Sequence, residues 1–67
     1  MAKITLAAAR VNANLTQEEL AEKMGVSRQS VIDWENGNRE MRTVYLNAFC
    51  HVVGLTADDI LLPIITT

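Results

Sequence analysis

The chain has 67 residues, 49% of them apolar and 21% charged, and a formal net charge of −2 at pH 7. This length supports one domain, residues 1–67, near the lower limit for a core that folds without disulfides or a structural metal. The lone Cys50 excludes an intrachain disulfide, and no apolar run reaches the roughly 20 residues of a membrane span. The start, "MAKITLAAAR", lacks the pattern of a signal peptide. We therefore expect a soluble, cytoplasmic protein.

The first two helices are predicted from their end signals. Proline occurs only at position 63, so nothing forbids helix across residues 3–62, and the first helix is expected over about residues 4–12. Thr16 and Glu19 have the spacing of a capping box, which begins a second helix at Gln17. Gly25 ends that helix, because glycine adopts the left-handed conformation of a helix end at little cost.

Three further helices are predicted after Gly25. Ser27 is the N-cap of a third helix that ends at the turn pair Asn36-Gly37. The polar segment "NREMR" is predicted to be a loop, and a fourth helix follows and stops at Gly54. Thr56 begins a short fifth helix, after which Ile60 and Leu61 are expected to face inward. The prediction is a compact all-α domain of five helices.

The second and third helices have the layout of a helix-turn-helix at about residues 17–36. They are about eight residues long and are separated by "GVS". At roughly 100° per residue, Ser27, Val31 and Trp34 fall on one side of the third helix. Four residues fall on the other side: Arg28, Gln29, Ile32 and Asp33. The buried and exposed faces of this helix are therefore predicted to be separate.

The run "LTQEELAEKMGVSRQSVIDWENG" resembles the phage repressor/Cro-type helix-turn-helix family, also called lambda-repressor-like or xenobiotic-response-element type. The resemblance extends from Leu6 to about Leu61. It implies a five-helix domain that binds double-stranded DNA, usually as a dimer on a palindromic operator. It also implies an internal ion pair between Arg10 and Glu35. Members often have proline soon after the turn, whereas this chain has "NREMRT", which leaves the path of that loop open.

The resemblance places base contacts on the third helix, and the chemistry of the side chains agrees. Arg28 has the fork that binds guanine O6 and N7, or else it contacts phosphate or is a solvated cation. Gln29 has the amide that binds adenine N6 and N7, or else it is a polar surface residue. Asp33 either accepts from cytosine N4, repels phosphate, or orients Arg28 or Gln29. Ile32 either touches a thymine methyl group or packs against the second helix.

Phosphate contacts are expected on both sides of this helix. Gln17 lies at a helix N-terminus, where free amides already attract an anion. The other candidates, from the resemblance or from their place beside the turn, are Ser30, Asn36, Arg39 and Arg42. For Arg39 and Arg42 the alternative is a solvated loop charge, and the neighbouring Glu40 weakens the local positive field. Phosphate contacts of this kind set the register on DNA without specifying sequence.

The apolar end of the chain, residues 62–67, predicts either a dimer interface or a tail that folds back on its own domain. Leu62, Ile64 and Ile65 have no obvious place in a core this small, and exposed aliphatic residues suggest an interface. Cys50 and His51 are adjacent, but a zinc site needs about four ligands. No metal, cofactor or small-molecule effector is expected, and no catalytic constellation is found.

The sequence therefore predicts a homodimeric transcriptional regulator, a Cro-like repressor of a phage or mobile element. A restriction–modification controller or an antitoxin-type regulator stays open within the same class. The alternative from another class is a protein-binding module of the same fold that docks another repressor or partner.

Overall fold

The computed structural model describes residues 3–61 and 65–66. This part of the chain contains four α-helices, one 3-10 turn and four two-residue strands. In chain order they are β1 (Ile4–Thr5), α1 (Leu6–Asn12), α2 (Gln17–Met24), α3 (Arg28–Asn36), β2 (Met41–Arg42), α4 (Thr43–Val53), η1 (Ala57–Asp59), β3 (Ile60–Leu61) and β4 (Ile65–Thr66).

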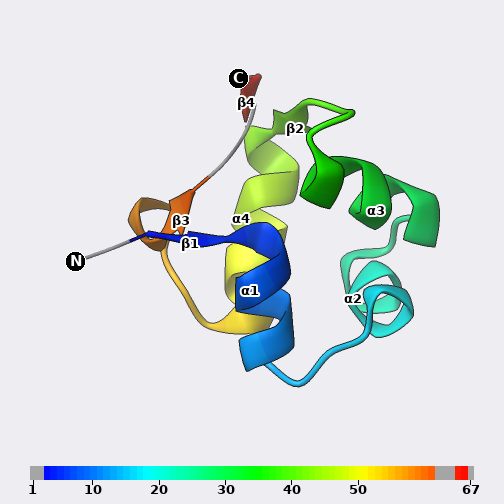
Figure 1. Ribbon diagram of the computed structural model, residues 1–67, viewed down its shortest axis with the longest axis horizontal. Coiled ribbons are helices and arrows are strands. Elements are labelled where there is room, and N and C mark those ends of the chain that lie inside the picture. Colours follow the sequence, from blue (N-terminus) through cyan, green and yellow to red (C-terminus); the bar gives the residue numbers. More distant parts are fainter. Residues whose placement is uncertain (1–2, 62–64, 67) are drawn as a thin grey trace.

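Helix α4 lies in the middle of the molecule, with α1 in front of it and α2 and α3 to one side (Figure 1). Helix α2 contacts both α3 and α4, and α1 contacts α3. The strands form two parallel pairs, β1 with β3 and β2 with β4. The first pair aligns Ile4 with Ile60. These contacts hold the helix-turn-helix against the rest of the domain.

The core lies between the helices and combines aliphatic side chains with the aromatic Phe49 and Trp34. The largest side chains with less than 2% exposure are Phe49, Leu20, Met41 and Val31. The other buried apolar residues are Leu6, Ala9, Ala21, Trp34, Leu46, Cys50 and Ile60. Residues from α2 and α3 therefore share one core with α1 and α4, which fixes the position of α3.

The predicted boundaries of α2 and α3 are confirmed by their caps. The N–H of Glu19 donates to Thr16 Oγ1 at 3.0 Å, and the N–H of Thr16 donates to Glu19 Oε1 at 2.9 Å. Gly25 ends α2 with a φ of 71°, in the left-handed region that favours glycine. Ser27 caps α3 by accepting from the N–H of Ser30 at 3.2 Å. The sequence signals thus predicted this helix pair.

The prediction of five helices was wrong at both ends of the domain. Helix α1 begins at Leu6 rather than residue 4, because Thr5 caps it by accepting from the N–H of Ala8 at 3.1 Å. The fifth helix is only the 3-10 turn η1, after which the backbone of Ile60 is extended and pairs with β1. Ile60 is buried as predicted, but Leu61 is 54% exposed because neighbouring strand residues point to opposite sides.

The segment predicted as the loop "NREMR" also contains a strand. Met41 is 1% exposed and forms β2 with Arg42, which pairs with Ile65–Thr66. A single apolar residue between polar neighbours gives no periodic signal, so the sequence did not reveal this core position.

None of the helices in the described ranges, residues 3–61 and 65–66, has the length and apolar character needed to span a membrane.

Candidate nucleic-acid interface

Helix α3 has one buried side and one accessible side. Val31 and Trp34 are buried in the core, whereas Arg28 and Gln29 are exposed. The other two predicted base contacts, Ile32 and Asp33, are half-buried.

The prediction that Ser27 belongs to the buried side was wrong. Ser27 is exposed, and Ser30 is buried with 8% exposure. The backbone of Ser27 is still extended, with φ −76° and ψ 153°, so the 100° rotation per helical residue does not apply to it.

Two polar side chains on the accessible side of α3 are bonded to each other. Gln29 Nε2 donates to Asp33 Oδ1 at 3.0 Å, one helical turn along α3. Arg28 lines a groove with residues that lead into or begin α2, among them Thr16 and Gln17. The first turn of α3 thus stands beside the N-terminus of α2.

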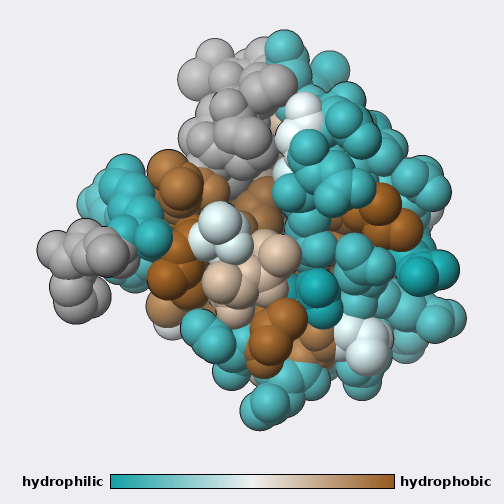
Figure 2. Space-filling view, viewed as in Figure 1, coloured by the Kyte–Doolittle hydropathy of each residue, from teal (hydrophilic) through white to brown (hydrophobic). Residues whose placement is uncertain are grey.

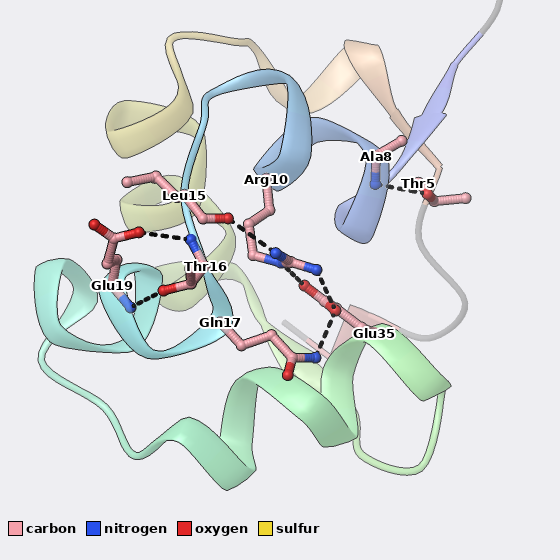
Figure 3. A network of polar contacts seen from close by, with 8 residues as sticks. All are labelled: Thr5, Ala8, Arg10, Leu15, Thr16, Gln17, Glu19 and Glu35. Atoms are coloured by element: carbon pink, nitrogen blue, oxygen red, sulfur yellow. Dashed lines mark hydrogen bonds and ion pairs between the residues drawn. The ribbon is translucent and has the colours of Figure 1, made fainter.

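A network around Glu35 ties the helix-turn-helix to α1 (Figure 3). Arg10 Nε donates to Glu35 Oε2 at 2.7 Å, forming the expected ion pair, and Arg10 Nη1 donates to the carbonyl of Leu15 at 2.9 Å. Gln17 Nε2 donates to Glu35 Oε1 at 3.0 Å. The side chains of Arg10 and Glu35 are only 15% and 6% exposed. One carboxylate therefore joins α1, the start of α2 and the last turn of α3.

The bond to Glu35 limits what Gln17 offers to a phosphate. A carboxylate only accepts hydrogen bonds, so the nitrogen end of the Gln17 amide must face Glu35. An amide nitrogen carries two hydrogens, and the second remains for another acceptor. The helix N-terminus that begins at Gln17 also presents backbone N–H groups.

The loop after α3 is held to that helix by Arg39. Its Nη1 donates to Ser30 Oγ at 2.7 Å, and its guanidinium lies 5.8 Å from the centre of the Trp34 ring. The hydroxyl of Ser30 also lies 3.0 Å from Ser27 Oγ. Of the residues expected to contact the DNA backbone here, Ser30 is buried and bonded within the protein. Asn36, Arg39 and Arg42 are exposed, and Arg39 also makes the contacts given above.

Sequence reasoning missed the aromatic cluster behind this loop. Trp34 Nε1 donates to the carbonyl of Glu40 at 3.2 Å, and the Trp34 and Tyr45 rings are 5.2 Å apart. The chain has one Trp and one Tyr, which was the available signal, but their meeting depends on how α4 packs. The cluster fixes the loop that carries Arg39 and leads into β2.

Polar and apolar surfaces occupy different parts of the molecule. Figure 2 shows a mainly hydrophilic surface over α2 and α3, and apolar side chains gathered beside β1, β3 and α1. The exposed acidic residues of α2 are Glu18, Glu19 and Glu22. Helix α2 thus carries three exposed carboxylates, while α3 carries Asp33 and the Glu35 that pairs with Arg10.

Cys50 and His51 are adjacent and raise the question of a metal site among the residues that the structure describes. No group of three or more His, Cys, Asp or Glu there is arranged to hold a metal ion. Cys50 is buried, and burial, with a smaller effect from the charge of Asp59, raises the pKa of its thiol. Cys50 thus behaves as a small apolar core residue.

Two short helices joined by a tight turn, the second with an accessible row of polar side chains, define a helix-turn-helix DNA-binding domain. The helix-turn-helix family of Cro/C1 type matches residues 6–60. The chain belongs to this family of DNA-binding transcriptional regulators, which are not enzymes.

A solved structure supports the lambda-repressor-like fold. The crystal structure of the clp gene regulator ClgR from C. glutamicum is similar, with a TM-score of 0.77 and 31% sequence identity. The similarity covers 81% of this chain and 69% of that one. No curated protein matches the sequence significantly.

Proposed function

We propose that the protein reads a palindromic operator as a homodimer in the cytoplasm and regulates transcription as a Cro-like repressor of a phage or mobile element. The observation that carries this proposal is the accessible row of Arg28, Gln29 and Asp33 on α3, in a helix-turn-helix of the Cro/C1 family. A repressor of this kind acts by covering the operator, so it needs no cofactor.

The reading side chains suit the major groove. Arg28 is exposed and supplies two parallel donors for guanine O6 and N7. Gln29 supplies a donor and an acceptor for adenine. Ile32 is half-buried on the same helix, and its apolar surface suits a thymine methyl group.

Phosphate contacts on both sides of α3 would set the position of the protein along the DNA. Gln17 contributes its second amide hydrogen beside the backbone amides at the start of α2. Asn36, Arg39 and Arg42 serve the other side. Ser30 contributes through Arg39, because its hydroxyl is already bonded within the protein.

The dimer is proposed to form at the C-terminal end, so that two copies of α3 stand about 34 Å apart, one turn of DNA. Leu61 supports this, because its side chain is 54% exposed beside a groove that Leu6 also lines. Leu62 and Ile64 lie outside the described residues, and so does the side chain of Ile65. The backbone of Ile65–Thr66 pairs with β2 of the same chain, as the fold-back alternative expects.

Sedimentation equilibrium tests the dimer, with Leu61→Lys as the variant. This substitution leaves β4 in place, whereas deletion of residues 62–67 also removes the partner of β2. A dimer at tens of micromolar that dissociates in Leu61→Lys is expected. A monomeric wild-type protein at that concentration would rule out the interface.

A gel-shift assay with the intergenic DNA that flanks the gene tests DNA reading. Arg28→Ala and Gln29→Ala should each weaken binding to the specific site by about 1–3 kcal/mol, roughly tenfold or more. Lys23→Ala is the matched control, because Lys23 is an exposed cation at the other end of α2. Equal binding by all four proteins would contradict the assignment of α3 as the reading helix.

The second candidate is a protein-binding module, favoured by the partly apolar groove that Leu6, Trp34 and Leu61 help to line. The gel-shift assay separates the two functions. Sequence-dependent binding that is lost in Arg28→Ala supports the regulator, and no DNA binding by the folded protein supports the module.

A further inference from the structure

Gln29 and Asp33 form a bonded pair on the accessible side of α3. Gln29 Nε2 donates to Asp33 Oδ1 at 3.0 Å, and residues four apart are neighbours on a helix surface. Gln29 is exposed and Asp33 is half-buried. The amide of Gln29 therefore has a preferred partner before any DNA is bound.

The bond determines which end of the Gln29 amide faces Asp33. Because a carboxylate accepts only, the nitrogen end faces Asp33 and the oxygen end faces away from it. The nitrogen has a second hydrogen, so the amide keeps one donor and one acceptor. These are the two groups that a glutamine needs to bind N7 and N6 of adenine.

The same carboxylate has an opposing effect on affinity. A negative charge on the reading helix repels the phosphates of any DNA, whatever its sequence. An amide that is already oriented loses less rotational freedom when it binds. Asp33 is thus expected to lower binding to all DNA while it raises the preference for one base.

We propose that Asp33 is a positioning residue, which holds the Gln29 amide in the orientation that recognises adenine and does not read a base itself. This inference rests on the proposed function, because it requires α3 to lie in the major groove. Of the three roles that the sequence left open for Asp33, the proposal selects the orientation of Gln29.

A double-mutant cycle tests the proposal on the duplex that wild-type protein selects from random DNA. Kd is measured for wild type, Asp33→Ala, Gln29→Ala and the double variant, on this duplex and on each single-base variant of one half-site. Gln29→Ala should lose about tenfold discrimination at one A·T pair. Asp33→Ala should lose about two- to tenfold at that same pair and gain affinity for unrelated DNA. The double variant should discriminate no worse than Gln29→Ala alone, since one residue acts through the other.

Asp33→Asn separates the hydrogen bond from the charge. Asparagine keeps an oxygen that accepts from Gln29 Nε2, so this variant should retain the discrimination at the A·T pair. It should also share the gain in affinity for unrelated DNA. Circular dichroism at the assay temperature verifies that each variant is folded.

Three results would overturn this proposal alone. Additive effects, with Asp33→Ala losing discrimination at a different base pair, would mean that Asp33 reads its own base. If Asp33→Asn lost as much discrimination at the A·T pair as Asp33→Ala, the charge of Asp33 and not its hydrogen bond would be responsible. Gln29-dependent discrimination at a pair other than A·T would refute the adenine assignment. Selection that enriches no sequence would overturn this proposal and the proposed function together, whereas the other results leave the proposed function standing.

Discussion

Glu35 has a structural role as well as a place on α3. Its side chain is 6% exposed, and its carboxylate accepts from Arg10 and Gln17, so it holds three helices at one point. A buried charge that loses its partner is costly, because the remaining ion is desolvated without compensation. This network keeps the N-terminus of α2 beside the reading helix.

Glu35→Ala should therefore lower the free energy of unfolding by about 3–5 kcal/mol, because it leaves the largely buried side chain of Arg10, 15% exposed, without its ion partner. Urea denaturation followed by circular dichroism measures this change. The double variant Arg10→Met/Glu35→Leu is the control and should be less destabilised, because neither charge remains. A loss below about 1 kcal/mol in Glu35→Ala would show that the pair is hydrated in solution.

At the scale of single residues, the sequence predicted side-chain chemistry better than side-chain partners. Arg28 and Gln29 are exposed on α3 as expected. Ser30 is buried and accepts from Arg39, which is itself exposed, and Gln17 donates to Glu35. These partners come from other elements or from the loop after α3, so spacing along one helix could not reveal them.

The capping boxes of α2 and η1 make the stability of the fold depend on pH. Hydrogen bonds from the backbone and hydroxyl of Thr16 lower the pKa of Glu19 below its ordinary 4.5. Bonds from Thr56 lower the pKa of Asp59 below 3.8 in the same way. A lowered pKa in the folded state means that the charged form favours folding. This contribution is complete above the unfolded pKa and is lost as pH falls through the folded one.

Stability should therefore fall as the pH drops below about 4.5, and Glu19→Gln should reduce that fall. Glutamine at this position still completes a capping box but does not titrate. Thermal unfolding across this range compares the two proteins, and Glu18→Gln serves as the control on the same turn. An identical pH dependence in wild type and Glu19→Gln would contradict the role assigned to this cap.

At the scale of elements, local signals predicted α2 and α3 and failed at the ends of the chain. Caps and glycines act within a few residues, so the boundaries at Thr16, Gly25 and Ser27 could be read directly. The pairing of β1 with β3 joins segments far apart in the sequence. The switch from a predicted fifth helix to η1 and β3 therefore required tertiary contacts that no local pattern contains.

The whole molecule is acidic, with a net charge of −2 and a pI near 5.1, although it belongs to a DNA-binding family. Net charge governs non-specific attraction and association rate, while specific binding needs only local complementarity. Glu18 of α2 lines the same groove as Arg28 and places a negative charge beside the reading helix. Weak non-specific binding is the expected consequence.

The salt dependence of binding should accordingly be modest. With about 4–6 phosphates neutralised per dimer, log K against log salt should fall with a slope of about −4 to −5. Fluorescence anisotropy on a labelled operator between low and physiological salt gives this slope. A value near −10 would mean that the contact surface is far larger than the one described.

The central claim is that α3 reads sequence in a palindromic site, and selection of sites from random DNA tests it most directly. The wild-type protein should enrich a two-fold symmetric sequence whose half-sites are about 10 base pairs apart from centre to centre. The same selection with Arg28→Ala should lose the preference at one G·C pair in each half-site. Enrichment of no sequence by the folded wild-type protein would contradict the account.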